Sequence, residues 1–178
     1  TGVLRLTYPQ SDAAGVIFNF SRRIAGHADL ERVNIVDDRH IEGHIHCTPK
    51  GGGFGRGAGG IGYELYFYIE LSKPMKESCF FANEEYLDKC LTETEGEDIG
   101  LLARFETSEN EDITLKCAIS YVDLEGAKLN FATECENIDF DTKMKTLQSE
   151  LKELLIAEEK SKADLLSVFK ELGYEIEL

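Results

Sequence analysis

An alternation of apolar and polar residues runs through most of the first 122 residues and constrains the fold more than any other feature. Successive side chains of a β-strand point to opposite faces of its sheet, so an alternating segment buries one face and exposes the other. Many short strands separated by turns predict a mainly β fold, an antiparallel β-sandwich. The expected strands cover residues 2–8, 14–20, 33–37, 40–47, 61–72, 77–82, 99–107 and 113–122.

The period changes at Asp123, after which apolar residues recur at three- and four-residue steps, as they do on one face of a helix. We therefore expect a β-sandwich domain over residues 1–135 and a helical C-terminal segment over residues 136–178. Before this segment we expect a short helix near 124–131. Within it we expect a helix from Asp141 to about Glu158, a further helix that starts at Ser161–Asp164 and ends at Gly173, and a last strand over 174–178. We expect the segments 21–30 and 83–96 to be polar, irregular connections between strands.

Charge narrows the class of partner. The chain has 178 residues and a formal net charge of -15, which disfavours polyanionic nucleic acid and anionic membrane surfaces as partners. A neutral ligand such as a sugar, or a protein, fits this charge better. We find no apolar run near the roughly 18 residues that a membrane helix needs, and no basic segment followed by an apolar one at the start, so we expect no secretory signal in this chain. The sequence does not indicate a cytoplasmic or a secreted location.

One segment concentrates imidazoles. In residues 40–47, Ile41, Gly43, Ile45 and Cys47 share one face, whereas His40, Glu42, His44 and His46 share the other. Three imidazoles and a carboxylate could hold zinc, but the same spacing is what a half-buried strand produces. We therefore interpret the segment as the polar outer face of a strand and expect no metal or cofactor in this chain.

A glycine-rich segment follows, with eight glycines between Gly51 and Gly62. It contains the pattern Gly55-x-Gly57-x-x-Gly60, but dinucleotide binding requires a helix directly after the pattern, and here a strand is expected. A purely structural interpretation of the segment is a flexible hairpin connection. The functional interpretation is a loop whose backbone approaches a carbohydrate closely. In that case the contacts would come from Gly52, Gly53, Phe54, with a flat apolar ring, and Arg56, with hydrogen-bond donors.

The remaining reactive side chains assign no catalytic site. Five cysteines lie at wide spacings, which favours buried free thiols, with one disulfide as the alternative. Carboxylates are abundant, yet a glycosidase acid–base pair is defined by separation in space, so none can be selected from the sequence. We assign no catalytic residue.

Several motifs taken in order resemble the N-terminal module of glycoside hydrolase family 92, the calcium-dependent exo-acting α-mannosidases known from bacteria. The resemblance covers about residues 1–155, and its most specific part is the run Glu125-Gly-Ala-Lys-Leu-Asn130 followed by Asp139-Phe-Asp141. The segments that carry it are Gly2–Pro9, Ile41–Gly43, Gly51–Gly55, Tyr66–Pro74, Ile119–Asn130 and Asp139–Asp141.

The resemblance implies a supersandwich-like β-module that precedes an (α/α)6 catalytic barrel absent from this chain, with residues 136–178 as the linker toward it. It implies that the barrel, rather than this module, carries the catalytic groups and the calcium, and that the full enzyme acts on mannose-containing glycans. Two alternatives stay open: an independent carbohydrate-binding module, and a structural or protein-interaction domain whose sheet edges bind a partner.

Overall fold

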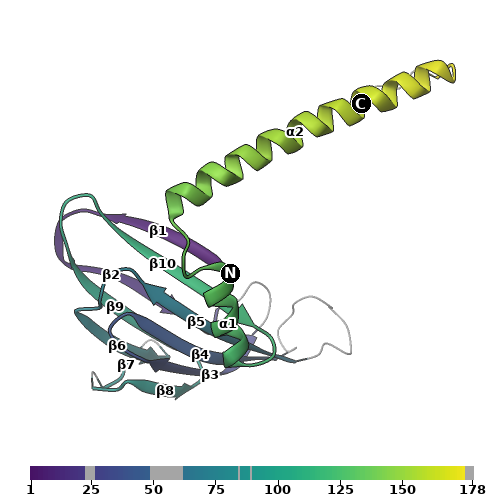
Figure 1. The fold of residues 1–178 in the computed structure, drawn as a ribbon. Coiled ribbons are helices and arrows are strands. Elements are labelled where there is room, and N and C mark those ends of the chain that lie inside the picture. The colour runs from purple at the N-terminus through teal and green to yellow at the C-terminus, as the bar shows by residue number, and fades with distance from the viewer. Residues whose placement is uncertain (23–26, 49–61, 84, 89, 175–178) are drawn as a thin grey trace. The chain divides into compact units, whose positions relative to one another are not determined.

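The computed structural model describes residues 1–22, 27–48, 62–83, 85–88 and 90–174. The chain divides into two compact units, Thr1–Asn137 and Ile138–Leu178. Within these described residues, the first unit contains ten strands and a short helix, and the second contains one long helix (Figure 1).

Six strands form the larger antiparallel sheet of the first unit. Its order in space is β1-β10-β5-β4-β3-β8, so strands from both ends of the unit lie side by side. The strands are β1 (Gly2–Tyr8), β10 (Glu111–Ser120), β5 (Tyr63–Leu71), β4 (His40–Thr48), β3 (His27–Ile35) and β8 (Glu93–Gly96). The predicted hairpin of β3 and β4 is confirmed, with Ile35 opposite Ile41 next to the turn.

Four strands form the second sheet, in the order β2-β9-β6-β7. All its pairs are antiparallel. The strands are β2 (Ser11–Asn19), β9 (Ile99–Thr107), β6 (Glu77–Ala82) and β7 (Glu85–Tyr86).

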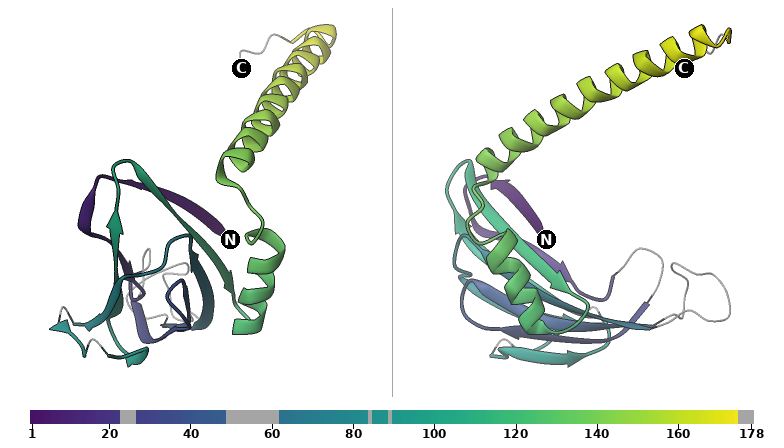
Figure 2. Two further views of the ribbon diagram at one scale, coloured as in Figure 1. Left: turned by 60° about the vertical axis from the view of Figure 1, so that its left-hand side comes forward. Right: turned by 45° about the vertical axis from the view of Figure 1, so that its right-hand side comes forward.

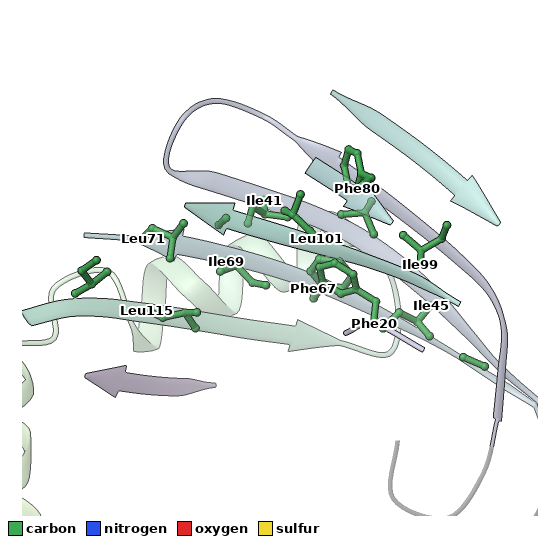
Figure 3. Close-up of a cluster of buried hydrophobic side chains, with 14 of the residues drawn as sticks. Phe20, Ile41, Ile45, Phe67, Ile69, Leu71, Phe80, Ile99, Leu101 and Leu115 are labelled. Atoms are coloured by element: carbon green, nitrogen blue, oxygen red, sulfur yellow. The ribbon is translucent and has the colours of Figure 1, made fainter. Parts of the chain in front are cut away.

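The core lies between the two sheets (Figure 3). Apolar residues from both contribute: Phe67 and Leu71 come from β5, whereas Phe80 and Leu101 come from β6 and β9. These side chains are at most 4% exposed. Burial of this kind stabilises a fold by about 1.5–3 kcal/mol for each large apolar side chain, so the period-two pattern both selects the strands and supplies their stability. The predicted antiparallel sandwich is confirmed.

Close packing fixes one glycine of the core. A Cβ at Gly43 would lie 2.2 Å from the carbonyl oxygen of Arg32 and 2.5 Å from the ring of Phe67. Gly43 is the partner of Phe67 across the β4–β5 pair. The absence of a side chain at this position therefore makes room for the phenylalanine ring.

Helix α1 (Leu124–Glu134) lies against the outer face of the larger sheet (Figure 2). Asp123 caps it by accepting a hydrogen bond from the Gly126 N–H at 2.6 Å. Phe131 and Ala127 are its buried residues, and Phe131 packs with Ala118 of β10. The helix expected near residues 124–131 is confirmed.

Helix α2 (Phe140–Glu171) makes up most of the second unit and corrects one expectation. Asp139 caps it through the Thr142 N–H at 2.8 Å, but the predicted second start at Ser161–Asp164 lies inside one continuous helix of 32 residues. The capping-box pattern has no effect there because the preceding residues, Ala157 to Lys160, are good helix formers and contain no glycine or proline. Gly173, with a φ of 82°, follows the end of the helix as expected.

Two expected connections contain strands. β3 begins at His27, inside the segment 21–30, and the acidic segment 83–96 contains β7 and β8. β8 is an edge strand that pairs only with β3 among the described residues, and the charged pair Arg32–Glu95 joins the two strands. Charged edge strands resemble solvated loops in sequence, because their outward side chains face water. The strand expected over 174–178 lies largely outside the described residues.

None of the described helices combines the length and the apolar character that crossing a membrane requires.

Candidate functional site

The outer face of β4 and β5 carries the polar residues that the sequence singles out. His40, Glu42, His44 and His46 lie on this face, while Ile41, Ile45 and Cys47 are buried on the opposite face. The alternation predicted for this segment is confirmed. The register places a polar or aromatic residue of β5 beside each member, with His44 opposite Tyr66 and His46 opposite Glu64.

His44 and His46 form the open end of this face. The His44 ring stacks on Tyr66 with 5.1 Å between ring centroids, and its Nε2 contacts the carboxylate of Glu64. His46 Nδ1 contacts Asp29, and its Nε2 lies 4.0 Å from Glu64 Oε1. The β3–β4 register shifts between Ala28 and Leu30, and the extra residue of this bulge, Asp29, reaches His46. We call His44, His46, Glu64, Tyr66 and Asp29 the imidazole cluster.

His40 occupies the other end of the same face. Its Nδ1 lies 2.8 Å from Asp37, its Nε2 lies 3.5 Å from Glu70, and its ring stacks on Tyr68. Burial by itself would raise the pKa of Asp37, but hydrogen bonds from the Arg39 N–H and from His40 outweigh it and lower the pKa. The carboxylate thus stays ionised and fixes the β3–β4 turn.

Helix α1 covers the centre of the face. Phe131 packs edge-on against Tyr68 with 5.1 Å between ring centroids, and Lys128 Nζ lies 3.0 Å from Glu42. Burial raises the pKa of the Tyr68 phenol, and the hydrogen bond to Glu42 raises the pKa of Lys128. The face is therefore structural where α1 covers it, and the imidazole cluster is the part left to contact other groups.

No metal geometry exists among the described side chains: no group of three or more His, Cys, Asp or Glu residues converges as a metal site would require. His40, His44 and His46 each contact a carboxylate instead. Rings, carboxylates and imidazoles side by side can instead accept and donate hydrogen bonds to a polar neutral ligand.

The glycine-rich segment follows β4 and precedes β5 in the sequence. β4 ends at Thr48 and β5 begins at Tyr63, and Cys47 pairs with Tyr63. The strand expected after the glycines is confirmed. The predicted carbohydrate contacts, Gly52, Gly53, Phe54 and Arg56, lie outside the described residues.

An aromatic pair that we did not predict lies at the same end of the sheet. Tyr63 and Tyr121 are 42% and 66% exposed, and their rings meet edge to face at 5.8 Å between centroids. Tyr63 starts β5 and Tyr121 follows β10, and these two strands pair antiparallel. Their proximity would have followed from the sequence only if that pairing had been known.

The five cysteines are free. Cys47 and Cys135 are buried, as the preferred interpretation of the sequence expects, whereas Cys79 and Cys117 are only partly buried and Cys90 is exposed. Burial raises the pKa of the Cys117 thiol to about 11, so this group stays protonated at neutral pH.

Comparison with known proteins identifies the fold with that of one enzyme family. A family 92 α-mannosidase from Bacteroides thetaiotaomicron matches with a TM-score of 0.67 and 23% identity, over 79% of this chain and 18% of that chain. A family 92 glycosyl hydrolase, ccman5, matches with a TM-score of 0.65 and 18% identity, over 83% of this chain and 18% of that one. A family 92 inverting mannosidase from Bacteroides thetaiotaomicron VPI-5482 has a TM-score of 0.60 and 19% identity, over 77% of this chain and 17% of its own.

These structures share the fold of this chain. The chain spans less than a fifth of the length of each of them. No curated protein matches the sequence. The sequence profile described as the glycosyl hydrolase family 92 N-terminal domain matches residues 1–120, which include the ten strands of the described part of the chain. The chain therefore belongs to glycosyl hydrolase family 92, of which it contains the N-terminal domain.

Proposed function

We propose that this chain is the non-catalytic β-sandwich module of an α-mannosidase, and that it supports a catalytic barrel carried by another part of the enzyme. The observation behind the proposal is the family match over residues 1–120, which covers the whole sandwich and is described as an N-terminal domain. The carboxylates on the outer face are consistent with a structural role. Glu42, Glu64 and Glu70 each contact a lysine or an imidazole of the same face.

The module would pack on the barrel at the end of the sandwich where β5 begins and β10 ends. Tyr121 and Val122, which follow β10, are exposed, and so is Leu129 of α1. The proposed contact would remove such apolar side chains from water, which favours it over free solvent. The second unit, residues 138–178, would be the linker toward the barrel.

The glycine-rich segment would contribute to a mannose-binding site at this same end. Glycines allow the backbone to approach a sugar closely, and we assign contacts to Gly52, Gly53, Phe54 and Arg56. Phe54 would lie against the pyranose C–H groups, and Arg56 would donate hydrogen bonds. The neighbouring imidazole cluster and the Tyr63–Tyr121 pair would extend the polar and aromatic surface.

A hydrolysis assay tests the first part of the proposal. The chain is incubated with an aryl α-mannoside and calcium, and release of the aryl alcohol is followed. We expect a rate equal to that of buffer, because the catalytic groups belong to the barrel. Turnover clearly above buffer would overturn the non-catalytic assignment.

An NMR titration tests the glycine-rich segment. Methyl α-mannoside is added to the isotopically labelled chain, with methyl β-galactoside as the sugar control. We expect amide shifts at Gly52, Gly53 and Arg56 that Phe54→Ala strongly reduces. Tyr174→Ala, which removes an exposed ring of the second unit, should leave them unchanged. Unchanged shifts in Phe54→Ala would contradict the assigned contact.

A further inference from the structure

A hollow of the first unit lies at the end of β4 opposite Thr48. Its volume is about 770 Å³, within the roughly 300–1,000 Å³ of small-molecule sites. We call it the turn-end pocket, because the β3–β4 turn contributes Asp37 and Asp38 to its wall. The nine residues of β4 run from the turn to Thr48, and at about 3.3 Å per residue the strand is roughly 30 Å long. The pocket and Thr48 therefore lie too far apart to contact one small ligand together.

One wall of the turn-end pocket is apolar and includes an exposed aromatic ring. Tyr86 of β7 is 68% exposed, and Val36 and Leu102 lie on the same lining. β7 has only two residues, and the β6–β7 pairing is limited to Phe81–Tyr86 and Ala82–Glu85. The sheet therefore ends at Tyr86 and presents the tyrosine ring to the hollow.

A strand edge supplies polar backbone groups to the pocket. The Leu87 N–H donates to the carbonyl of Phe80 at 2.9 Å, so the backbone groups of Phe80 point away from β9. Along an antiparallel strand, the backbone N–H and C=O groups of every second residue point to the same side. The N–H and C=O of Ser78 therefore point, like those of Phe80, away from β9 and toward the pocket. Among the described residues these two groups have no hydrogen-bond partner. The N–H and C=O of Ser78 thus offer one donor and one acceptor, which lie at most about 5 Å apart because both belong to one residue.

Side chains add a cation and an anion without described partners. The guanidinium of Arg104 and the carboxylate of Asp38 both line the pocket, and neither forms an ion pair or hydrogen bond with the described residues. Lys76, in contrast, is held by Glu106 at 3.0 Å. The arrangement thus offers hydrogen-bond donors and acceptors that none of the described protein groups uses.

The charge of the lining selects a neutral ligand. Three carboxylates and two cationic side chains line the pocket, so their charges nearly cancel. An anionic ligand would also meet the overall negative charge of the chain. An apolar ring beside paired donors and acceptors matches the two surfaces of a sugar, whose C–H face is apolar and whose hydroxyls both donate and accept.

We infer that the turn-end pocket is a second carbohydrate-binding site, which takes a neutral oligosaccharide against Tyr86, Ser78 and Arg104. No residue of the glycine-rich segment is among the residues that we assign to this site. The site would hold a glycan chain on the module at a distance from the mannose that the enzyme processes. This goes beyond the proposed function, because it holds even if the glycine-rich segment binds no sugar.

Addition of a partner strand to β6 is the rival explanation of the free edge. Strand addition needs several consecutive free backbone positions, but β7 already pairs with Phe81 and Ala82. The free part of β6 is limited to Glu77–Cys79, which leaves Ser78 as the one residue whose groups point outward. A compact ligand fits this short stretch better than a strand does.

An NMR titration of the complete chain tests the inference with α-1,2-mannobiose, α-1,6-mannobiose and cellobiose as probes. At least one disaccharide should shift the amides of Ser78, Tyr86 and Arg104 in a saturable way. Tyr86→Ala and Arg104→Gln should each weaken that binding about tenfold, as truncation of a Tyr or Arg anchor does. Tyr174→Ala is the matched aromatic control, and retained dispersion of the remaining amides shows that the variants are folded.

The outcomes separate this site from the glycine-rich segment. Retained binding in Phe54→Ala, with loss in Tyr86→Ala, supports the second site. Shifts confined to Gly52–Arg56 and insensitive to Tyr86→Ala would overturn it while leaving the proposed function intact. Absence of saturable shifts with all three disaccharides would also overturn it, as would self-association abolished by Tyr86→Ala, which would make the pocket a protein interface.

Discussion

The two faces of the β4–β5 pair use the same stretch of chain in opposite ways. Inward, Ile41, Phe67 and Leu71 are almost fully buried between the sheets. Outward, His44 and Tyr66 stack on each other beside carboxylates and remain partly accessible. Neighbouring residues thus differ in role because strand geometry sends them to opposite faces. The inner face should determine stability, whereas the part of the outer face that α1 leaves uncovered can change with little effect on folding.

Adjacent residues of β5 provide the strongest test of this comparison. Phe67 is 4% exposed, and its ring stacks on Phe20 with 4.9 Å between centroids. Phe67→Ala should lower the free energy of unfolding by about 3–5 kcal/mol, because the lost burial adds to the cavity left behind. Tyr66→Ala, on the outer face, should lower it by less than about 1 kcal/mol. Urea unfolding of both variants measures the difference, and equal losses would refute the division between the faces.

The second test adds a methyl group to the inner face. A Cβ at Gly43 would lie 2.2 Å from the Arg32 carbonyl oxygen, which is backbone and cannot move without shifting β3. Gly43→Ala should therefore destabilise the chain by about 1–3 kcal/mol, as overpacking of a core does. Gly2→Ala is the matched control, since nothing lies within 4 Å of a Cβ there. Thermal unfolding of the two variants should differ clearly; a Gly43→Ala melting curve like that of Gly2→Ala would show that β3 and β4 yield easily.

Sequence reasoning was most successful where one face of a strand is buried. The strands β6 and β9 begin and end at the predicted residues, because short runs rich in apolar and aromatic residues, with Phe80, Leu101 and Phe105 facing the core, are bounded by polar or turn-forming segments. The inner and outer residues of β4 were also predicted. For these elements burial alone determines the pattern, and a local window of sequence contains that information.

Edge strands and pairing across long distances were not predictable in the same way. β8 consists of Glu93–Gly96, and its glutamates face water, so its assignment depends on its partner β3 rather than on its own residues. The turn-end pocket joins the β3–β4 turn to β6, β7 and β9, and the Tyr63–Tyr121 pair joins β5 to the end of β10. Such proximities depend on strand order, which no local pattern specifies.

A third test weakens the attachment of α1 to the outer face. Lys128 Nζ lies 3.0 Å from Glu42, and the lysine side chain is 38% exposed. Lys128→Met removes the charge but retains the methylene chain, so we expect a loss of less than about 1 kcal/mol. Substitution of the partner, Glu42→Gln, should lower the free energy of unfolding by a similar amount. The double variant should lose no more than either single variant. Losses that add in full would mean that the two residues act independently.

The smallest effect concerns pH at the β3–β4 turn. Hydrogen bonds from Arg39 and His40 lower the pKa of Asp37 below its ordinary value of 3.8. A carboxylate with a lowered pKa stabilises the folded state above the unfolded pKa, and this stabilisation is lost as the pH falls through the folded pKa. Asp37→Asn should therefore cost stability at pH 5 and progressively less toward pH 2. The carboxylate is 52% exposed, so solvent screening should limit the difference to less than about 0.5 kcal/mol.

Asp38→Asn is the matched control for this last test, because the Asp38 side chain accepts no hydrogen bond from the described residues. Unfolding in urea at pH 5, 4, 3 and 2 gives the stability difference of each variant from the parent chain. For Asp37→Asn the stability difference from the parent chain should shrink as the pH falls. At low pH the parent chain loses by protonation the same negative charge that the substitution removes. A difference that stays constant over this range would place the effect of Asp37 in the shape of the turn rather than in its charge. The outer face would then contribute to stability through backbone geometry, and its imidazole partners could be replaced without a change in acid sensitivity.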